Sequence, residues 1–299
     1  MSIIYLPLAS LALFGANIFY PSMGILLSLF APLLLLLYLV DERREKLSDI
    51  ISATALIVSA YFFPIMAGYY AVMVLFTAYF ILYCNRNNLY PNWLPVAGSP
   101  IPIFLVAAFV VYLLPDSRDM LIDIVKQLLT NMTEAVKQSP NNEVPEHYIA
   151  VLEQNIDQAA RSAVFIFPGL NYSFVSLIAY FTMNFFLKMK KSEHIPFRLP
   201  DNAVWIMIAG VACFFIGGEI PRSIGMNTLL IFTSLYFFQG FEIVRFWLGR
   251  FNVFPLIKAI LYILIFSQFT LIILIALQGL FSIWLNMYPR PEEEKTEED

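Results

Sequence analysis

The sequence predicts an all-α polytopic integral membrane protein. About nine transmembrane helices are expected, in a range of eight to ten, together with an amphipathic helical segment outside the membrane. The 299 residues are 60% hydrophobic and 13% charged, whereas soluble domains are about 45–50% apolar and about 25% charged. Stretches without charged side chains recur along the chain, and a spanning helix needs about 20 mainly apolar residues. This composition excludes a large soluble domain, and a count of two cysteines excludes a disulfide-rich secreted scaffold.

Residues 1–115 form the predicted N-terminal transmembrane block. Pro21 interrupts its first charge-free run, and Pro64 divides the second. Proline interrupts a helix because it lacks the backbone N–H and clashes with the preceding turn. A loop rich in asparagine and proline is expected before the last span, from Asn85 to Pro100. The five expected spans cover about residues 3–18, 22–40, 50–63, 66–84 and 101–114.

Residues 116–161 are interpreted as an amphipathic extracytoplasmic helical segment. Apolar side chains recur there at helical spacing between charged and amide side chains. They are Leu121, Val125, Leu128, Met132 and Val136. Pro140 ends this pattern, and a second amphipathic stretch runs from about Glu146 to Ala163. The segment therefore predicts two helices outside the bilayer.

Residues 162–288 form the predicted C-terminal transmembrane block, and residues 289–299 form an acidic tail that is expected to be disordered. The four expected spans cover about residues 162–187, 202–217, 224–248 and 254–287. The last run would be about 50 Å long at the rise of an α-helix, which exceeds a hydrocarbon core of about 30 Å. It is expected either to project beyond the bilayer or to break near Ser267-Gln268.

The orientation follows from the basic residues of two short loops. Lysines and arginines concentrate in residues 41–48 and 188–201, and cytoplasmic loops carry an excess of these residues. Both loops are therefore expected in the cytoplasm, and residues 116–161 on the opposite side.

Polar side chains inside the last spans are the candidate substrate-binding residues. Glu242 and Arg245 stand three positions apart, so they can pair along one helix. They form either a polar lining at the cytoplasmic mouth of a cavity or an ion pair that locks two helices together. Asn227, Gln239 and Gln268 hydrogen-bond either a substrate or a neighbouring helix.

Two further pairs have two interpretations each. Ala12 and Ala16 place small side chains on one face of the first span, which lets another helix approach closely. They form either a docking face for a partner membrane protein or ordinary internal packing. Glu219 and Arg222 flank a turn with Pro221 and form either a solvated turn pair or a gate.

The chain carries no motif for catalysis, and we expect no enzymatic activity, no cofactor and no metal site. The two histidines, His147 and His194, fall on opposite sides of the membrane in the predicted topology and cannot share a metal ion. A nucleophile elbow, a Walker loop and a dinucleotide fingerprint do not occur in the sequence. The basic residues form no patch suited to nucleic acid.

Several short motifs resemble the YybS-like bacterial membrane proteins, a family with a domain of unknown function. The motifs are Phe197-Arg198-Leu199-Pro200, a helix start at Trp205, and Asn227 followed by Tyr236 to Gln239-Gly240. The paired N-terminal spans, the charged middle segment and the long last helix are similar to the family layout over nearly the whole chain. One departure is that Ser282 and Asn286 stand where the family's terminal signature carries acids. The resemblance implies a multi-pass protein of the bacterial cytoplasmic (inner) membrane.

The YybS-like family is distantly similar to the substrate-binding membrane subunits of energy-coupling-factor vitamin importers. Those subunits bind a small molecule between helices and dock on an energising transmembrane partner through small residues of the first span. The resemblance therefore implies a docking role for Ala12 and Ala16.

The function expected from the sequence is a small-molecule-binding or transport subunit embedded in the lipid bilayer. Because the chain lacks an ATPase motif, such a subunit relies on an energising or coupling membrane protein or on an ion gradient. The alternative is a structural or regulatory scaffold that binds other envelope proteins. A cavity with a bound molecule favours the first function, and a dry bundle with an apolar surface on residues 116–161 favours the second.

Overall fold

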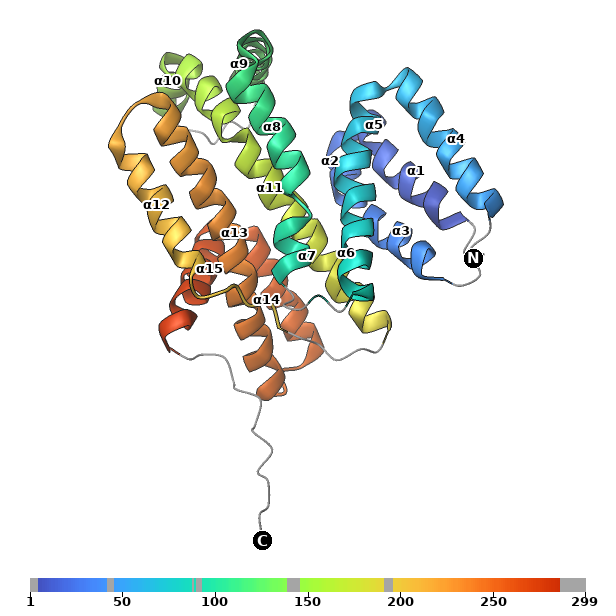
Figure 1. Cartoon of the computed structure of the whole chain (residues 1–299). Helices are drawn as coiled ribbons and strands as arrows, with labels where there is room; N and C mark the ends of the chain where they lie inside the picture. Colours follow the sequence, from blue (N-terminus) through green and yellow to red (C-terminus); the bar gives the residue numbers. More distant parts are fainter. Residues whose placement is uncertain are drawn as a thin grey trace.

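Every regular element that the computed structural model describes is a helix (Figure 1). The described residues are 5–41, 46–87, 89, 93–138, 146–190 and 196–285. The N-terminal helices are α1 (Leu6–Phe19), α2 (Pro21–Ser28), α3 (Ala31–Val40), α4 (Lys46–Phe62), α5 (Pro64–Tyr70), the π-helical turn η2 (Ala71–Leu75) and α6 (Phe76–Arg86). The remaining helices are α7 (Trp93–Gly98), α8 (Ile101–Leu113), α9 (Pro115–Gln138), α10 (Glu146–Gln154), α11 (Ile156–Met189), α12 (Ala203–Ile216), α13 (Glu219–Arg250), α14 (Pro255–Ser267) and α15 (Phe269–Leu285).

Five helical stretches within the described residues are long and apolar enough to cross a membrane. They are Met23–Val40, Pro64–Arg86, Trp93–Leu113, Ile156–Met189 and Glu219–Arg250. The bent pair of α14 and α15 makes a sixth if it is one broken span. Three shorter apolar helices, Leu6–Phe19, Asp49–Phe62 and Ala203–Ile216, reach only about 21 Å each at the α-helical rise. A count of nine spans is therefore not confirmed.

Two details of the spans refine or correct the predictions from the sequence. The last apolar run breaks at Gln268, whose backbone is extended (φ −114°, ψ 110°), and the two halves meet at 100°. This confirms the break near Ser267-Gln268. The expected loop before the fifth span instead contains α7, whose Pro95 lies in the first helical turn, where its missing N–H costs nothing.

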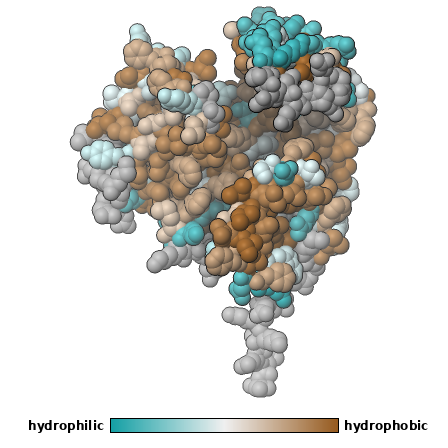
Figure 2. All heavy atoms as spheres, turned by 180° about the vertical axis from the view of Figure 1, so that it is seen from behind, coloured by the Kyte–Doolittle hydropathy of each residue, from teal (hydrophilic) through white to brown (hydrophobic). Residues whose placement is uncertain are grey.

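Helices α9 and α10 occupy the charged middle segment and project from one end of the molecule (Figure 1). Helix α9 confirms the first helix predicted there. The second stretch, expected as one helix from about Glu146 to Ala163, is divided at Asn155 into α10 and the start of α11, and the side of the membrane stays a prediction. Hydrophilic residues gather at this end, and apolar residues cover much of the rest of the surface seen in Figure 2. The acidic tail at 289–299 lies outside the described residues.

Helix α11 runs through the middle of the bundle and contributes to three hydrophobic clusters. It packs Val175, Ile178, Ala179 and Phe186 into the core of the N-terminal helices. Tyr172 and Tyr180 belong to the core formed with α13 and α15. Ala160, Val164 and Phe165 pack with α8 and α9. The two transmembrane blocks are therefore joined by shared side chains and not only by the chain.

Glycines let the helices around α13 touch backbone to backbone. A Cβ on Gly240 would lie 1.9 Å from the carbonyl oxygen of Ile275, and one on Gly279 would lie 2.0 Å from that of Tyr236. Helix α12 approaches α13 at Gly225, where a Cβ would lie 2.6 Å from the nitrogen of Phe214. Small residues at such crossings strengthen packing between membrane helices, where the hydrophobic effect contributes little.

Candidate functional site

Gln239 sits beside the α13–α15 crossing and is 1% exposed. Its Oε1 accepts a hydrogen bond from the backbone N–H of Leu199 at 2.9 Å. Its Nε2 donates to the carbonyl of Gly279 at 3.0 Å and to the hydroxyl of Ser282 at 2.9 Å. One amide thus joins α13, α15 and the segment before α12. This geometry favours the helix-contact interpretation over a substrate contact.

We expect Gln239→Leu to destabilise the fold, because it leaves the buried N–H of Leu199 without the amide. The carbonyl of Gly279 keeps the hydroxyl of Ser282 at 2.6 Å. Each unsatisfied buried group costs about 1–3 kcal/mol. The matched control is Gln268→Leu, because Gln268 is exposed at the break between α14 and α15, and such surface changes stay within about 0.5 kcal/mol. Unfolding in detergent followed by circular dichroism measures both, and equal stability of the two variants would contradict the structural role of Gln239.

Glu242 is 3% exposed and lies in the bundle core about one helical turn beyond Gln239 on α13. Its Oε1 accepts a hydrogen bond from the hydroxyl of Tyr180 at 2.5 Å and lies 3.7 Å from Arg245 Nη1. Arg245 Nη1 also donates to Asn184 Oδ1 at 3.0 Å. The cavity beside these groups has a volume of about 10 Å³, which is room for about one water molecule. The predicted pairing of Glu242 with Arg245 is present. The cavity beside it is too small for a small-molecule substrate.

Asn227 is 4% exposed and bridges α13 to the middle of α11. Its Oδ1 accepts from the N–H of Gly169 at 2.6 Å, and its Nδ2 donates to the carbonyl of Phe165 at 2.7 Å. Gly169 and Phe165 stand four positions apart, as the donor and acceptor of one helical turn do. Pro168 between them removes one N–H from the helix, and membrane helices tolerate proline where neighbouring helices satisfy the backbone. Asn227 hydrogen-bonds the backbone of the turn that contains Pro168.

The hydrogen bonds around Asn227 extend to the end of the bundle that carries α9 and α10. Its Nδ2 also lies 3.0 Å from the hydroxyl of Tyr112 and 2.9 Å from the carbonyl of Ser223. The hydroxyl of Tyr112 lies 2.5 Å from the hydroxyl of Ser223. The Ser223 hydroxyl donates a hydrogen bond to the carbonyl oxygen of Phe165 at 3.0 Å. Phe165 and Ser223 form the floor of a cavity at this end, so Asn227 holds that floor in place.

This cavity of about 850 Å³ opens between α11 and the turn that joins α12 to α13. We call it the outer cavity. Its lining is Asp157, Gln158, Arg161, Ser162, Phe165, Ile166, Phe214, Gly217, Gly218, Glu219, Arg222, Ser223 and Met226. Within the described part of the chain, neither Arg161 nor Arg222 forms an ion pair, and the Arg222 guanidinium lies over the Phe214 ring at 5.0 Å. The expected Glu219–Arg222 turn pair is therefore not formed.

The carboxylates of the outer cavity are partly engaged. Lys126 of α9 lies 2.5 Å from Asp157 Oδ1, and this hydrogen bond and the negative charge raise the pKa of the Lys126 ammonium above its ordinary value. Glu219 is exposed at the first turn of α13. Among the described residues, the cavity therefore presents two unpaired guanidinium groups against one unpaired carboxylate.

A comparison with protein-family models matches residues 8–282 to DUF2232, which is described as a predicted membrane protein. The chain belongs to the DUF2232 family. Comparisons with curated proteins and with solved structures find no match. The DUF2232 match confirms a membrane protein, and the YybS-like name and the similarity to vitamin importers stay predictions.

Within this DUF2232 fold, the structure brings some of the sequence-predicted site residues together and separates others. Gln239, Glu242 and Arg245 share one stretch of α13. Asn227 lies about 18 Å from Gln239 along the helix axis at 1.5 Å per residue. Gln268 is exposed and makes no side-chain hydrogen bond within the described residues. The five residues therefore form no single pocket.

Ala12 and Ala16 line an open groove of about 370 Å³ between α1 and the joint of α4 with α5. Ala12 is exposed and Ala16 is half-buried. A Cβ added to Gly15, which stands between them, would meet no atom within 4 Å, so the groove is wide at this point. Their placement on an open face agrees with either interpretation, and the docking role stays a prediction.

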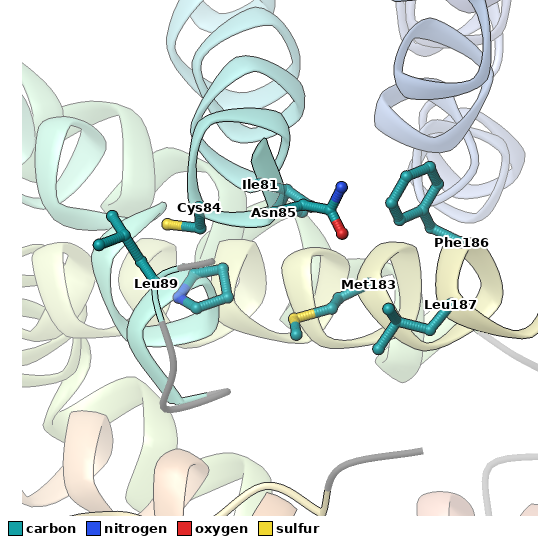
Figure 3. Close-up of a pocket in the computed structure, with 8 residues that line it drawn as sticks. Ile81, Cys84, Asn85, Leu89, Met183, Phe186 and Leu187 are labelled. Atoms are coloured by element: carbon teal, nitrogen blue, oxygen red, sulfur yellow. The ribbon is translucent and has the colours of Figure 1, made fainter. Parts of the chain in front are cut away.

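Another small cavity separates α6 from α11 (Figure 3). Ile81, Cys84 and Asn85 come from α6, and Met183, Phe186 and Leu187 face them from α11. The cavity has a volume of about 20 Å³, which is again room for about one water molecule. No group of three histidine, cysteine, aspartate or glutamate side chains able to hold a metal ion occurs among the described residues.

The outer cavity was not predicted from the sequence. In the sequence, Arg161 is one charge of an amphipathic stretch, and Arg222 is half of an expected turn pair. Their separation of 61 positions hides their proximity. The only sequence signal is that both arginines stand next to a serine, Ser162 and Ser223, at the start of a predicted span.

Proposed function

We propose that this DUF2232 protein is a membrane-embedded subunit that binds a small anionic molecule in the outer cavity. The observation that carries the proposal is a cavity of about 850 Å³ whose lining includes two arginines without an ion pair among the described residues. Pockets for small molecules span about 300–1,000 Å³ and carry a few polar groups that fix the ligand. Guanidinium groups bind carboxylates and phosphates through paired hydrogen bonds, so the ligand is expected to carry one of these groups.

The proposal places the protein in the bacterial inner membrane with nine spans, of which the shorter helices α1, α4 and α12 supply three. The protein has no enzymatic role in this proposal. Movement of the ligand depends on a coupling membrane protein or an ion gradient, because the sequence has no ATPase motif. The open groove at Ala12 and Ala16 is the proposed contact with such a partner.

The test combines native purification with variants of the cavity arginines. Protein extracted gently from native membranes is analysed by mass spectrometry, and a panel of small carboxylates and phosphate esters is screened by thermal shift. Arg161→Gln and Arg222→Gln are each expected to weaken binding by roughly 10- to 100-fold, since a hydrogen bond to a charged group contributes about 1.5–3 kcal/mol. Arg86→Gln is the control, because Arg86 is exposed at the end of α6, as Arg161 and Arg222 are on their helices, but does not line the outer cavity. An equal loss in the control, or no ligand in any form, would contradict the proposal.

A scaffold function is the second candidate, and one observation favours it. Helix α9 exposes an apolar stripe at intervals of four positions. The stripe consists of Met120, Ile124, Leu128 and Met132, which are 43–66% exposed. A stoichiometric envelope protein in the same purification, without a bound small molecule, would support the scaffold and contradict the binding subunit.

A further inference from the structure

A second large cavity lies under α14, far along α13 from the outer cavity. It has a volume of about 500 Å³ and is open to the surroundings. Its lining is Phe181, Phe241, Tyr262, Ile263, Phe266 and Ser267. Apart from the tyrosine and serine hydroxyls, this lining is apolar. We call it the α14 cavity.

Helix α14 stands off the bundle and touches it mainly through aromatic rings. Of its 13 residues, Ile265 is the buried one, while Leu256, Ile260 and Ile263 are 57–69% exposed. The ring of Tyr262 lies 5.1 Å from that of Phe241, and the ring of Phe266 lies 5.8 Å from that of Phe181. These rings form the aromatic floor of the cavity, and Ile263 adds an exposed aliphatic side chain to its lining. The hydrocarbon interior of a membrane contains no water to fill such a space.

Two basic side chains lie on the same side of this aromatic floor. Helices α13 and α14 are joined by a short turn after Arg250 and run in opposite directions (Figure 1). Arg245 follows Phe241 by four positions, and Lys258 precedes Tyr262 by four positions. Each base is therefore about 6 Å, or one helical turn, from a floor residue toward the same end of the molecule.

Arg245 and Lys258 differ in how far neighbouring groups compensate their positive charges. Arg245 is near Glu242 and donates a hydrogen bond to Asn184, and its side chain is 41% exposed. Lys258 is half-buried and has no ion-pair or hydrogen-bond partner for its side chain in the described part of the chain. An anion at this position would meet one uncompensated positive charge and one partly compensated charge.

We propose that the α14 cavity binds an anionic phospholipid, with an acyl chain on the aromatic floor and the phosphate between Lys258 and Arg245. Basic pockets between transmembrane helices at the cytoplasmic side bind anionic headgroups, and the sequence predicts this end to be cytoplasmic. An apolar floor with a cationic rim matches an amphiphile. A small water-soluble anion would leave the floor empty. The site is separate from the outer cavity, so the inference does not depend on the proposed function.

Native mass spectrometry of the purified full chain tests the headgroup contact. The probes are phosphatidylglycerol and phosphatidylcholine with identical acyl chains. Wild-type protein is expected to bind phosphatidylglycerol more tightly, and Lys258→Gln is expected to weaken that binding about fivefold, the effect of about 1 kcal/mol for one base near the membrane. Phosphatidylcholine binding is expected to stay unchanged. Equal binding of the two lipids by the wild type would overturn the proposal.

Arg250→Gln is the matched control for a nonspecific basic surface. Arg250 lies at the same end of α13, but its guanidinium covers the Trp247 ring at 5.3 Å. It stands nine positions from the floor residue Phe241, whereas Arg245 and Lys258 each stand four positions from a floor residue. The control is expected to keep the lipid preference. A loss equal to that of Lys258→Gln would show general attraction to the membrane surface and contradict a specific site.

Ile263→Trp tests the acyl-chain contact. Ile263 is 69% exposed and lines the cavity, so a larger side chain fills the space without disturbing the core. Both lipids are expected to bind several-fold more weakly, with their ratio preserved. Glycerol phosphate in large excess is expected not to displace the lipid. Unchanged binding to the variant, or displacement by glycerol phosphate, would show that the site takes a free anion and would overturn the proposal.

Discussion

Gly279→Ala is expected to separate α13 from α15 and to destabilise the fold by about 3 kcal/mol, at the upper end of the usual cost of overpacking. The added Cβ would lie 2.0 Å from the carbonyl oxygen of Tyr236 and 2.7 Å from the nitrogen of Gly240. These obstacles are backbone atoms of a helix, which cannot rotate away as a side chain can. The whole crossing must therefore open, and the hydrogen bond from Gln239 to the carbonyl of Gly279 is lost with it.

The measurement is the unfolding equilibrium in detergent, where about 3 kcal/mol corresponds to roughly a hundredfold change in the equilibrium constant. Gly249→Ala is the matched control on α13. A Cβ there meets no atom within 4 Å, and alanine favours a helix over glycine by about 1 kcal/mol. The control is expected to be as stable as the wild type or more stable. A Gly279→Ala protein with wild-type stability would show that the two helices do not touch at this point.

Asn227→Leu is expected to cost about 3 kcal/mol and to weaken ligand binding in the outer cavity. The change leaves the N–H of Gly169 without the amide, and an unsatisfied buried group costs about 1–3 kcal/mol. The carbonyl of Phe165 also loses the amide but keeps the hydroxyl of Ser223 at 3.0 Å. It also releases Ser223 and Phe165, which form the cavity floor. Leucine has the branching and the number of side-chain heavy atoms of asparagine, but its methyl groups are bulkier, so the effect combines the lost hydrogen bonds with overpacking.

Asn227→Asp separates the hydrogen bonds from the shape of the side chain. The carboxylate keeps an acceptor for Gly169, but it also directs an oxygen at the carbonyls of Phe165 and Ser223. It is therefore expected to be no more stable than the leucine variant at neutral pH. Asn171→Leu is the control, because Asn171 is half-buried and its amide donates a hydrogen bond only to the carbonyl of Phe167 in the preceding turn of α11. Unfolding in detergent and the thermal shift with ligand measure both effects. A stable Asn227→Leu protein would contradict a stabilising contact between Asn227 and the turn of α11 that contains Pro168.

The helical class and most span positions could be predicted because they depend on local composition. The break at Gln268 was expected because the last apolar run is too long for one crossing. Helix α7 was missed because the asparagines and prolines before Pro100 are typical of a loop. Pro95 is nevertheless compatible with the first turn of a helix. The three short helices show why a span count is harder, since composition marks an apolar run but not the depth it reaches.

The candidate site was predicted less well, because it depends on contacts between distant positions. The pairing of Glu242 with Arg245 follows from their spacing, and it is present. The partners of Asn227 and Gln239 are backbone groups of Gly169, Leu199 and Gly279, which no sequence pattern marks. The outer cavity depends on the meeting of α11 with the α12–α13 turn, which only the folded arrangement brings about.

The central place of α11 has a consequence for the order in which the protein is made. The core of the N-terminal helices includes Val175, Ile178, Ala179 and Phe186 of α11, so that core stays incomplete while the ribosome is still producing α9 and α10. During this interval the first helices expose their unfilled packing surface to lipid or to the insertion machinery. Assembly of the N-terminal half therefore finishes late in synthesis, together with the C-terminal half that α11 also joins.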